Sequence, residues 1–510
     1  MAPFLTDWCK SFTGSAKAVI RPFSTEEVAS IVRLCAKHYV SIVPQGGNTG
    51  LVIGSVPDSC GNAIVLSLTR LNRIRDIDVA NHTMTVESGC ILDNVRNTAA
   101  ESGLLFPLSI ASSGSCTIGG NLSSNAGGTA GLRYGSAREL CLGLEVVNPQ
   151  GEVWNGLRSL RKDNTGYDLR DLFIGSEGTL GIITAAVLKL FPQPKARMTA
   201  FAGLRTPADA LHLLSIARRH CDAALTEFEL MSGHSLQLVS KHFPQLSLPL
   251  STKHRQYALL EFSDAESEEH AMSLLERVIG DAIKEDIVQD AAVASSIAQA
   301  NAMANLRGHI FSAQSMEGRY IKHDVAVPIS RVADFIESTD ALLQKNFPGC
   351  RIVAFGHLGD GSLHYNVFPP EGAFDKSMTL QGEINRIVYD SVDLFDGSIS
   401  PEYGIGSLKR SELLVHKSAF ELEMMLKIKH ALDPHQLMNP GKVFMSAIAT
   451  KNETMAGENI RAFSGGYGSQ PVCSDVECCA TGGISRNNRS DEESYCGEKG
   501  NAGGSCIEHA

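Results

Sequence analysis

The sequence has no excess of basic residues: 45 Lys and Arg stand against 56 Asp and Glu, which gives a formal net charge of −11. A surface of that sign repels nucleic acids and anionic lipids, so neither is expected as the main partner. The first ten residues also lack the basic head and apolar run of a secretory signal and the Arg-rich pattern of a mitochondrial presequence. We therefore expect a cytoplasmic protein, with a mitochondrial location as the alternative.

A membrane-spanning segment is also missing from the sequence. The longest stretch without a charged residue, 102–132, has 19 Gly, Ser, Thr, Asn or Pro among its 31 residues, and no lipid-facing helix has that composition. A hydrophobic content of 43% over 510 residues is instead typical of a globular protein with more than one domain.

No two of the 13 cysteines have the C-x-x-C spacing of a zinc or redox site. Eight are spread singly through the first 450 residues, as expected of small buried side chains in a reducing compartment. The other five crowd into the last 60 residues, which have almost no hydrophobic periodicity. We expect residues 447–510 to form a disordered tail. Its cysteines are Cys473, Cys478, Cys479, Cys496 and Cys506.

Two nucleotide-binding motifs are absent, the dinucleotide fingerprint G-x-G-x-x-G and the phosphate loop G-x-x-x-x-G-K-S/T, which disfavours a nicotinamide enzyme and a nucleotide triphosphatase. Three Gly-rich segments nevertheless occur, at 44–50, 114–121 and 175–182. The first follows a predicted strand, and its consecutive N–H groups can form a nest for a diphosphate. The second lacks bulk and charge, so its backbone can approach a large ligand closely. One such segment alone is more simply a flexible loop, but three together favour an extended cofactor.

Hydrophobic spacing predicts a different arrangement of helices and strands on each side of a domain boundary. Helices are predicted at 24–38 and 91–101, and strands at 40–43, 64–68 and 84–87. Pro192 and Pro194 indicate a domain boundary. Beyond it, a strand and helix at 197–204 and 207–219 resemble a second pair at 256–262 and 266–279, which suggests a duplicated βα unit in an antiparallel α+β domain. Further helices are predicted at 289–306 and 421–432, and the ordered fold is expected to end near residue 445.

The dipeptide Asp360-Gly361 separates two strand-like runs and predicts a two-residue hairpin turn. In that register His357 lies directly opposite His364, and Asn366 shares their face. Two adjacent imidazoles supply two-thirds of a metal site, and a carboxylate such as Glu402 would complete it for Zn²⁺ or a similar divalent cation. The alternative is a pair of surface histidines beside a turn.

Seven motifs occur in one order: PQGGNTGL at 44–51, GSCTIGGN at 114–121, NAGG at 125–128, RKDNTGYDL at 161–169, GSEGTLGI at 175–182, GHLGDGSLHYNV at 356–367 and NPGKV at 439–443. Through them the chain resembles the FAD-dependent D-2-hydroxyacid dehydrogenases. These include D-2-hydroxyglutarate dehydrogenase, the branch with the strongest likeness, D-lactate dehydrogenase and the catalytic subunit of glycolate oxidase.

The resemblance implies an α+β fold of the vanillyl-alcohol-oxidase or p-cresol methylhydroxylase (PCMH) type. An FAD-binding domain of two α+β subdomains would occupy residues 1–195. An antiparallel α+β cap domain would occupy residues 196–446, with its C-terminal segment returning to the FAD domain. The FAD would be bound non-covalently, because no His stands in the 44–50 loop. The implied FAD contacts are Pro44, Gln45, Gly46, Gly47, Asn48, Thr49, Gly50, Pro107, Ser115, Gly119, Gly120, Asn121, Asn125, Gly128, Gly178, Ile183 and Asn439.

The resemblance also implies a reaction: a D-2-hydroxy acid, D-2-hydroxyglutarate or D-lactate, is oxidised to the 2-oxo acid as C2 passes a hydride to flavin N5. The metal ligands would be His357, His364 and Glu402, and the substrate contacts Arg307, Lys322 and Asn366. The reduced flavin would pass its electrons to an electron-transfer flavoprotein, a quinone or a cytochrome. A homodimer is left open.

Three residues depart from the family pattern. The family's catalytic base is a His directly after the Glu ligand, but here it is Tyr403, whose ordinary pKa of ~10 makes it a poor base at neutral pH. Phe311 replaces a residue with a hydroxyl group, and Pro401 replaces a small residue. Either a metal or a neighbouring cation activates Tyr403, or a metal alone acidifies the substrate, or the chain is a catalytically impaired flavin-binding paralogue with a structural or partner role.

Overall fold

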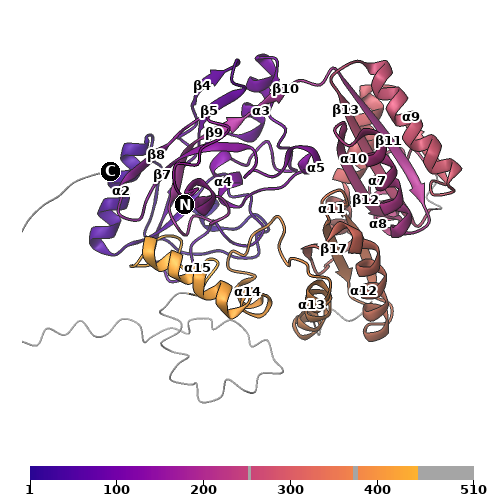
Figure 1. Cartoon of the computed structure of the whole chain (residues 1–510). Coiled ribbons are helices and arrows are strands. Elements are labelled where there is room, and N and C mark those ends of the chain that lie inside the picture. Colours follow the sequence, from indigo (N-terminus) through magenta and orange to yellow (C-terminus); the bar gives the residue numbers. More distant parts are fainter. Residues whose placement is uncertain (251–253, 371–376, 446–510) are drawn as a thin grey trace, which may run out of the picture. The chain divides into compact units, whose positions relative to one another are not determined.

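The computed structural model describes residues 1–250, 254–370 and 377–445, so the predicted tail lies outside the described residues. Its N-terminal part contains a parallel sheet of order β1-β3-β2 and an antiparallel sheet of order β4-β5-β9-β7-β8 (Figure 1). The strands of the first are β1 (Ala18–Ile20), β2 (Ser41–Gln45) and β3 (Ala63–Ser67). Those of the second are β4 (Ile74–Asp78), β5 (Thr83–Glu87), β7 (Cys141–Val147), β8 (Val153–Gly156) and β9 (Ile182–Lys189).

Short helices and a small two-stranded sheet complete this part. The helices are α1 (Ala2–Leu5), α2 (Thr25–His38), α3 (Leu92–Glu101), α4 (Ile118–Ser123), α5 (Gly131–Tyr134) and α6 (Arg170–Phe173). The two-stranded sheet pairs β6 (Leu104–Leu105) with β10 (Phe191–Pro192). The predicted helices at 24–38 and 91–101 and the three predicted strands agree with the structure to within two residues. In α2, Oγ of Ser24 accepts the N–H of Glu27, as expected of a helix cap.

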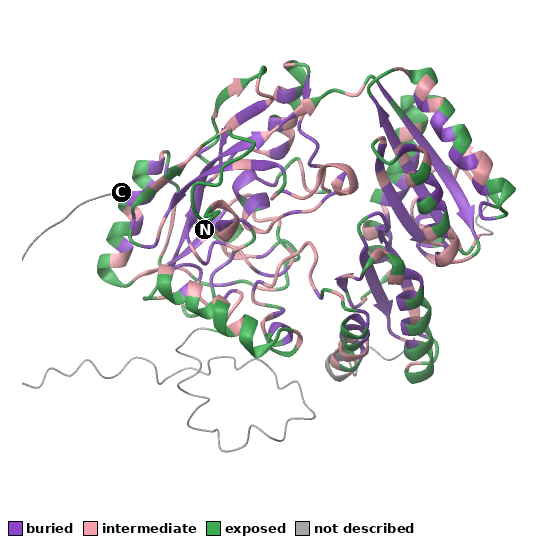
Figure 2. Cartoon of the chain, in the orientation of Figure 1, coloured by how far each residue is buried: buried purple, intermediate pink, exposed green. Residues whose placement is uncertain are grey.

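A seven-stranded antiparallel sheet of order β14-β11-β13-β12-β16-β17-β15 forms the second part. Its strands are β11 (Ala196–Leu204), β12 (Leu225–Ser232), β13 (Gln256–Asp264), β14 (Asp290–Val293), β15 (Asp324–Ala326), β16 (Arg351–His357) and β17 (Ser362–Phe368). Alternate residues of β12 face opposite sides: Phe228 and Leu230 belong to one apolar cluster, and Met231 to another. The strands are accordingly buried and their covering helices carry the exposed residues (Figure 2).

Helices cover both faces of this sheet. One cluster includes α7 (Pro207–Cys221), α9 (Glu268–Lys284), α12 (Val332–Asn346) and α13 (Ser377–Leu394). The other includes α8 (Gly233–His242), α10 (Ile297–Gly308) and α11 (Ile310–Glu317), and a single 3₁₀ turn, η1 (Ile329–Arg331), precedes α12. The predicted duplication is present, because β11 leads into α7 and β13 into α9.

The predicted helix at 289–306 is wrong in its first half. Residues 290–293 form β14, in which Ala200 of β11 pairs with Val293, and the helix α10 begins only at Ile297. Ser296 ends the extended segment, since its side chain accepts the N–H of Gln299 as an N-cap. Residues 290–293 fit an edge strand as well as a helix, and pairing with β11 decides between them.

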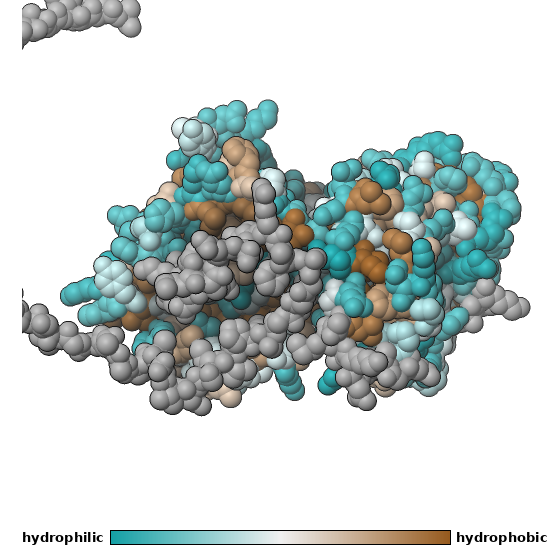
Figure 3. Space-filling view, turned by 90° about the horizontal axis from the view of Figure 1, so that it is seen from below, coloured by the Kyte–Doolittle hydropathy of each residue, from teal (hydrophilic) through white to brown (hydrophobic). Residues whose placement is uncertain are grey.

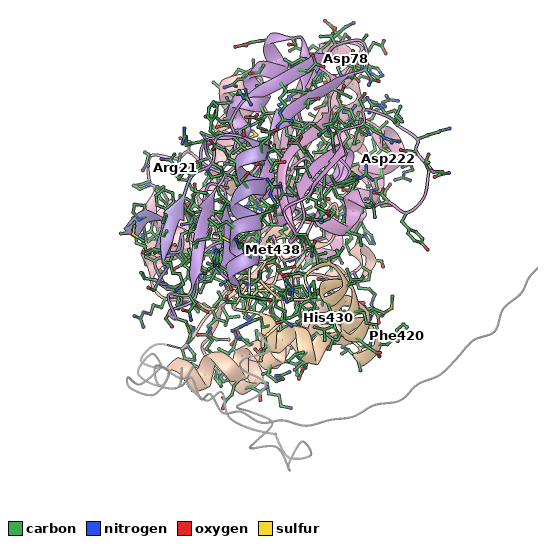
Figure 4. All side chains as sticks on the ribbon, turned by 90° about the vertical axis from the view of Figure 1, so that its left-hand side faces the viewer. Arg21, Asp78, Asp222, Phe420, His430 and Met438 are labelled. Atoms are coloured by element: carbon green, nitrogen blue, oxygen red, sulfur yellow. The ribbon has the colours of Figure 1, made fainter. Side chains whose placement is uncertain are left out.

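The C-terminal segment returns to the N-terminal part after α14 (Arg410–His416) and α15 (Ala419–Leu432). The N–H of Ile42 in β2 donates to the carbonyl of Leu437 at 2.8 Å, and the N–H of Asn439 donates to the carbonyl of Ile42 at 2.8 Å. Figure 4 marks Met438, which lies between these two bonds, above the helix that carries Phe420 and His430. The segment therefore extends the edge of the first sheet.

The surface combines hydrophilic residues with several hydrophobic patches (Figure 3). Exposed apolar side chains include Leu414 on α14 and Phe420 and Met424 on α15. Within the described ranges, no helix is both long enough and apolar enough to cross a membrane.

Candidate active site

The β16–β17 hairpin pairs Phe355 with His364 and Val353 with Asn366, so the predicted pairing of His357 with His364 is wrong by two residues. The loop contains four residues, 358–361, because Oδ1 of Asp360 accepts the N–H of Ser362 and the N–H of Gly361 donates to the carbonyl of His357. A shift of two residues leaves every side chain on its face of the sheet. The two His rings therefore still meet, with centroids 6.0 Å apart.

Glu402 joins the two histidines. One donor atom from each of His357, His364 and Glu402 lies within 4.8 Å of the other two, and Nε2 of His357 is 3.4 Å from Oε1 of Glu402. Burial opposes ionisation of Glu402, but the hydrogen bond and the charge of His357 outweigh burial. The pKa of Glu402 is therefore lowered to about 2. Burial lowers the pKa of His364 to about 3, so its ring is neutral, as a metal ligand must be. Two nitrogens and one carboxylate are a donor set that suits Zn²⁺.

A buried carboxylate on the neighbouring strand orients His357. Glu229 of β12 pairs directly with His357, and its carboxylate accepts a hydrogen bond from Nδ1 of that ring. This bond leaves Nε2 of His357 directed at Glu402. Burial disfavours a charged ring, but the charge of Glu229 raises the pKa of His357 well above its ordinary value. A metal ion bound at Nε2 of His357 would replace the proton that this atom carries when the ring is charged.

Glu229 also holds Arg307, which reaches the site from α10. Nε of Arg307 donates to Oε2 of Glu229 at 2.7 Å, and the guanidinium lies over the ring of Phe355, 4.7 Å from its centroid. Among the described residues, the two terminal nitrogens of Arg307 have no hydrogen-bond partner. A guanidinium fixed through Nε keeps its terminal fork available for a carboxylate ligand.

The loop that carries Glu402 and Tyr403 is held from the side of β15. Oδ2 of Asp324 accepts the N–H of Glu402 at 3.2 Å and that of Tyr403 at 3.0 Å. The hydroxyl of Tyr403 lies 3.3 Å from Nδ1 of His364. Burial, followed by the negative charges of Asp324 and Glu402, raises the pKa of Tyr403 well above its ordinary value.

The other predicted substrate contacts differ in their surroundings. Asn366 is buried, and its amide donates to Gln314 at 2.9 Å and accepts the N–H of His323 at 3.2 Å. The ring of Phe311 packs against His364, with centroids 4.9 Å apart. Lys322 is exposed, and its ammonium lies 5.4 Å from the ring centroid of Tyr320.

Sequence reasoning did not predict Glu229, Asp324 or Gln314. Glu229 could have been suspected from the sequence, because it is a charged residue between the apolar residues Phe228 and Leu230. Such a residue needs a buried partner. Its partner could not be chosen, since His357 is 128 residues away and the pairing of β12 with β16 is a property of the whole sheet.

The first two Gly-rich segments lie against each other. A Cβ atom added at Gly46 would come within 2.2 Å of Oγ1 of Thr117, and one added at Gly47 within 2.0 Å of the carbonyl oxygen of Ser115. Only glycine permits this approach of two backbones. Pro44 and Gln45 belong to β2, and residues 46–50 follow it directly. The loop thus begins at a strand end, where a cofactor's diphosphate can meet free N–H groups.

Polar atoms without a protein partner occur around this junction. Among the described residues, Oγ of Ser88, Oγ1 of Thr117 and Oδ1 of Asn439 are buried and accept or donate no hydrogen bond. A cavity of about 380 Å³ lies beside Thr117. Its lining consists of Thr69, Asn72, Ile74, Gly89, Cys90, Ile91, Asn94, Ser115 and Thr117. Of the three residues, Thr117 lines this cavity, and a buried hydroxyl without a partner at a cavity wall fits a polar ligand.

Three of the remaining predicted cofactor residues, Gly178, Gly119 and Asn439, lie in or close to the Gly-rich segments. A Cβ atom at Gly178 would come within 3.0 Å of Pro44, and one at Gly119 within 2.6 Å of Ser88. The amide of Asn439 donates to the carbonyl of Glu177 at 2.7 Å. Pro107, Asn121, Gly128 and Ile183 are buried, Asn48, Thr49 and Asn125 are half-buried, and Gly50, Ser115 and Gly120 are exposed.

Comparison with known proteins identifies both parts of the chain. Residues 16–156 match the family described as FAD binding domain, and residues 193–443 the family described as FAD linked oxidases, C-terminal domain. The fold is similar to that of p-cresol methylhydroxylase, with a TM-score of 0.69 and 16% identity over 87% of this chain and 92% of that one. It is also similar to alkyldihydroxyacetonephosphate synthase, with a TM-score of 0.64 and 19% identity over 83% and 76%. The chain is thus an FAD-binding protein with the predicted α+β, PCMH-type fold.

Curated relatives define the family more narrowly. D-2-hydroxyglutarate dehydrogenase of Xanthomonas citri pv. viticola is 38% identical over 88% of this chain and 93% of its own length. The mitochondrial D-2-hydroxyglutarate dehydrogenases of Danio rerio and Arabidopsis thaliana are 37% and 35% identical over 86% of this chain and 80% and 77% of theirs. The chain belongs to the FAD-dependent D-2-hydroxyacid dehydrogenase family, as the motifs predicted.

Proposed function

We propose that this member of the family oxidises D-2-hydroxyglutarate to the 2-oxo acid with non-covalent FAD and a divalent cation, most simply Zn²⁺, held by His357, His364 and Glu402. One observation carries the proposal: the three metal-ligand side chains converge within 4.8 Å, and Glu229 ties His357 to Arg307. A cation and a guanidinium beside it provide two anchors for an anionic 2-hydroxy acid. D-lactate is the alternative substrate.

When bound, FAD would accept the hydride from C2 and the cation would polarise the substrate's hydroxyl group. The protein supplies binding and orientation. Arg307 presents its terminal nitrogens to a carboxylate while Glu229 fixes its Nε atom. Asn366 is locked by Gln314 and the N–H of His323, so its position is set before the substrate arrives. We further propose that Lys322 meets the distal carboxylate of a dicarboxylic substrate.

Tyr403 stands at the position of the family's base. Its raised pKa keeps the phenol protonated at neutral pH, and its hydroxyl contacts Nδ1 of His364. We therefore assign it the role of orienting His364, and we expect slower proton removal from the substrate than a histidine would give. The catalytically impaired paralogue is the less favoured alternative, because the metal-ligand set and Arg307 are in place.

Anaerobic reduction of the flavin tests the proposal. The FAD-loaded protein is mixed with D-2-hydroxyglutarate, D-lactate or D-2-hydroxy acids with apolar side chains, with and without a chelator, while the yellow absorbance is followed. We expect D-2-hydroxyglutarate to bleach the flavin and the chelator to slow bleaching at least tenfold. A yellow protein that none of these acids reduces would support the impaired paralogue instead.

The electron acceptor and the cellular location of the protein are also proposals. An electron-transfer flavoprotein, a quinone or a cytochrome fits a flavin that must be reoxidised after each turnover. The eukaryotic relatives are named mitochondrial, whereas the bacterial relative is not. Fractionation of cells that express the full chain, with activity measured in each fraction, distinguishes the cytoplasm from the mitochondrion.

A further inference from the structure

Glu177 connects two regions that are 228 residues apart in the sequence. Its carboxylate accepts the N–H of Ile405 at 2.7 Å and the N–H of Gly406 at 2.8 Å. These N–H groups belong to the loop that begins with Glu402. Glu177 itself lies in the third Gly-rich segment, 175–182, and has a positive φ of 54°. A non-glycine residue in this conformation is held by its surroundings.

The backbone of Glu177 is fixed by residues of the FAD-binding part. Its N–H donates to the carbonyl of Ser123 at 2.8 Å, at the end of α4. Its carbonyl accepts the side-chain amide of Asn439 at 2.7 Å, and that amide also donates to the carbonyl of Gly54 at 2.9 Å. At the next residue, Gly178, an added Cβ atom would come within 3.0 Å of the Pro44 side chain in β2. The position of Glu177 is therefore set by segments that match the FAD contacts of the family.

The loop fits closely around this carboxylate. A Cβ atom at Gly404 would come within 2.7 Å of Oε1 of Glu177, and the φ of Gly404 is 78°. Asp324 holds the same loop from the other side through the N–H groups of Glu402 and Tyr403. The buried carboxylate of Asp324 and the half-buried carboxylate of Glu177 thus hold four N–H groups within residues 402–406. Asp324 acts from the seven-stranded sheet, and Glu177 acts from the FAD-binding part.

We propose that Glu177 is a positioning residue: it places the metal ligand Glu402 and thereby couples the FAD-binding segments to the metal site. The inference rests on the proposed metal site. If Glu177 acts in this way, removing its carboxylate weakens metal binding although no metal ligand has been changed. Loss of a residue that holds a metal ligand in place commonly alters metal affinity 10–100-fold. A role confined to general packing would leave metal affinity unchanged at equal stability.

The test compares variants of the full FAD-loaded chain. Zn²⁺ affinity is measured by competition with a chromogenic chelator, and FAD content and melting temperature are recorded for the same samples. We expect Glu177→Ala to weaken Zn²⁺ binding about tenfold or more. Glu177→Gln keeps one acceptor oxygen but presents an amide group to the second N–H, so a smaller loss is expected. Glu145→Gln is the matched control, since Glu145 is a buried carboxylate that accepts Thr25 and Thr184 and does not touch the loop.

A second variant covers the case in which Glu177→Ala fails to retain FAD. Gly404→Ala leaves the carboxylate intact and inserts a methyl group at the contact between Glu177 and the loop, so it is also expected to weaken Zn²⁺ binding. Zn²⁺ affinities within twofold of the wild type in both Glu177→Gln and Gly404→Ala would overturn the positioning role of Glu177 but leave the proposed metal site intact. A wild-type chain that binds neither Zn²⁺, Co²⁺ nor Mn²⁺ would overturn the proposed metal site and this inference with it.

Discussion

The hydroxyl oxygen of Tyr403 lies 3.3 Å from Nδ1 of His364, and the two rings are almost parallel, at 18° to each other. The stacked rings put a phenol beside His364, a proposed metal ligand, at the place where the family resemblance puts the base. Burial raises the pKa of the phenol well above its ordinary value, which favours a protonated Tyr403 that hydrogen-bonds to His364 over a Tyr403 that removes the substrate's proton.

Restoring a histidine at this position should raise the rate of flavin reduction. A general base typically contributes ~10²–10⁴-fold, so we expect Tyr403→His to increase the anaerobic rate by about tenfold or more. The control is Tyr403→Phe, which removes the hydroxyl but keeps the stacked ring, and which should lose less than about tenfold. Stopped-flow absorbance with D-2-hydroxyglutarate measures both. A histidine variant no faster than the wild type would contradict the role assigned to position 403.

Gly127 should tolerate no side chain. An added Cβ would lie 2.6 Å from Oε1 of Glu402, so Gly127→Ala must displace the carboxylate that completes the metal-ligand set. We expect about tenfold weaker Zn²⁺ binding, as for other disturbances around a ligand. Gly131→Ala is the matched control in the same segment, since its Cβ would make an ordinary 3.4 Å contact with Asp360. Equal Zn²⁺ affinity in the two variants would argue against the close approach of Gly127 to Glu402.

The Arg307→Lys variant should show whether substrate binding needs only the positive charge of Arg307 or also its forked geometry. Lysine keeps the positive charge but cannot form two parallel bonds to a carboxylate while also holding Glu229. We expect KM for D-2-hydroxyglutarate to rise about tenfold, with a smaller change in kcat, because one charge-assisted hydrogen bond is worth about 1.5–3 kcal/mol. Steady-state kinetics with an artificial electron acceptor provide both constants. A change in kcat alone would place Arg307 outside the substrate-carboxylate site.

Phe311→Thr should shift the substrate preference. The ring of Phe311 lies against Phe355 and His364, with centroids 5.1 and 4.9 Å away, so it adds an apolar surface beside the proposed metal site. A hydroxyl group at this position adds a hydrogen-bonding partner for a polar substrate. We expect the ratio of kcat/KM for D-2-hydroxyglutarate to that for an apolar D-2-hydroxy acid to rise about tenfold. An unchanged ratio would show that residue 311 does not face the substrate's side chain.

Asp340 should make the fold less stable at neutral than at mildly acidic pH. Burial raises the pKa of Asp340 from 3.8 to about 6, and the hydroxyl of Tyr365 donates to its carboxyl group. The folded state therefore binds more protons than the unfolded state between about pH 4 and pH 6, and stability falls as pH rises through that window. Asp340→Asn keeps the acceptor oxygen without the charge.

We expect the Asn variant to melt at a higher temperature than the wild type at pH 7.5, with a gain of about 3 kcal/mol, and at nearly the same temperature at pH 4. Thermal unfolding followed by circular dichroism at both pH values measures the difference. A gain of equal size at the two pH values would show that the charge of Asp340 is not its cause.

Local patterns predicted much of the fold. Helix α2 was predictable because its apolar spacing and its Ser24 cap lie within a single stretch of sequence. The face shared by His357 and His364 was also predictable, because side chains alternate in any strand. The register was not, since the Asp360 side chain bonds to Ser362 and enlarges the turn, and nothing in the flanking residues signals this.

The site depended on pairings that no local pattern contains. Glu402 was one candidate carboxylate among many in the sequence, because it lies 38 positions beyond His364, and only the family resemblance favoured it over the others. Glu229 and Asp324 act through strands β12 and β15, whose places in the sheet are settled by the packing of the whole sheet. Residues that bind a ligand directly were therefore easier to find than those that hold them in place.

The return of residues 437–439 to β2 has a consequence for the biosynthesis of the protein. The N-terminal sheet is translated early, but the edge of β2 gains its last hydrogen bonds from a segment made almost 400 residues later. A nascent chain that has not yet released residue 439 from the ribosome lacks the amide group that bridges Gly54 and Glu177. The N-terminal sheet is thus completed only after almost the whole folded region has been translated, and a chain truncated before Leu437 should lack these edge hydrogen bonds and unfold at a lower temperature.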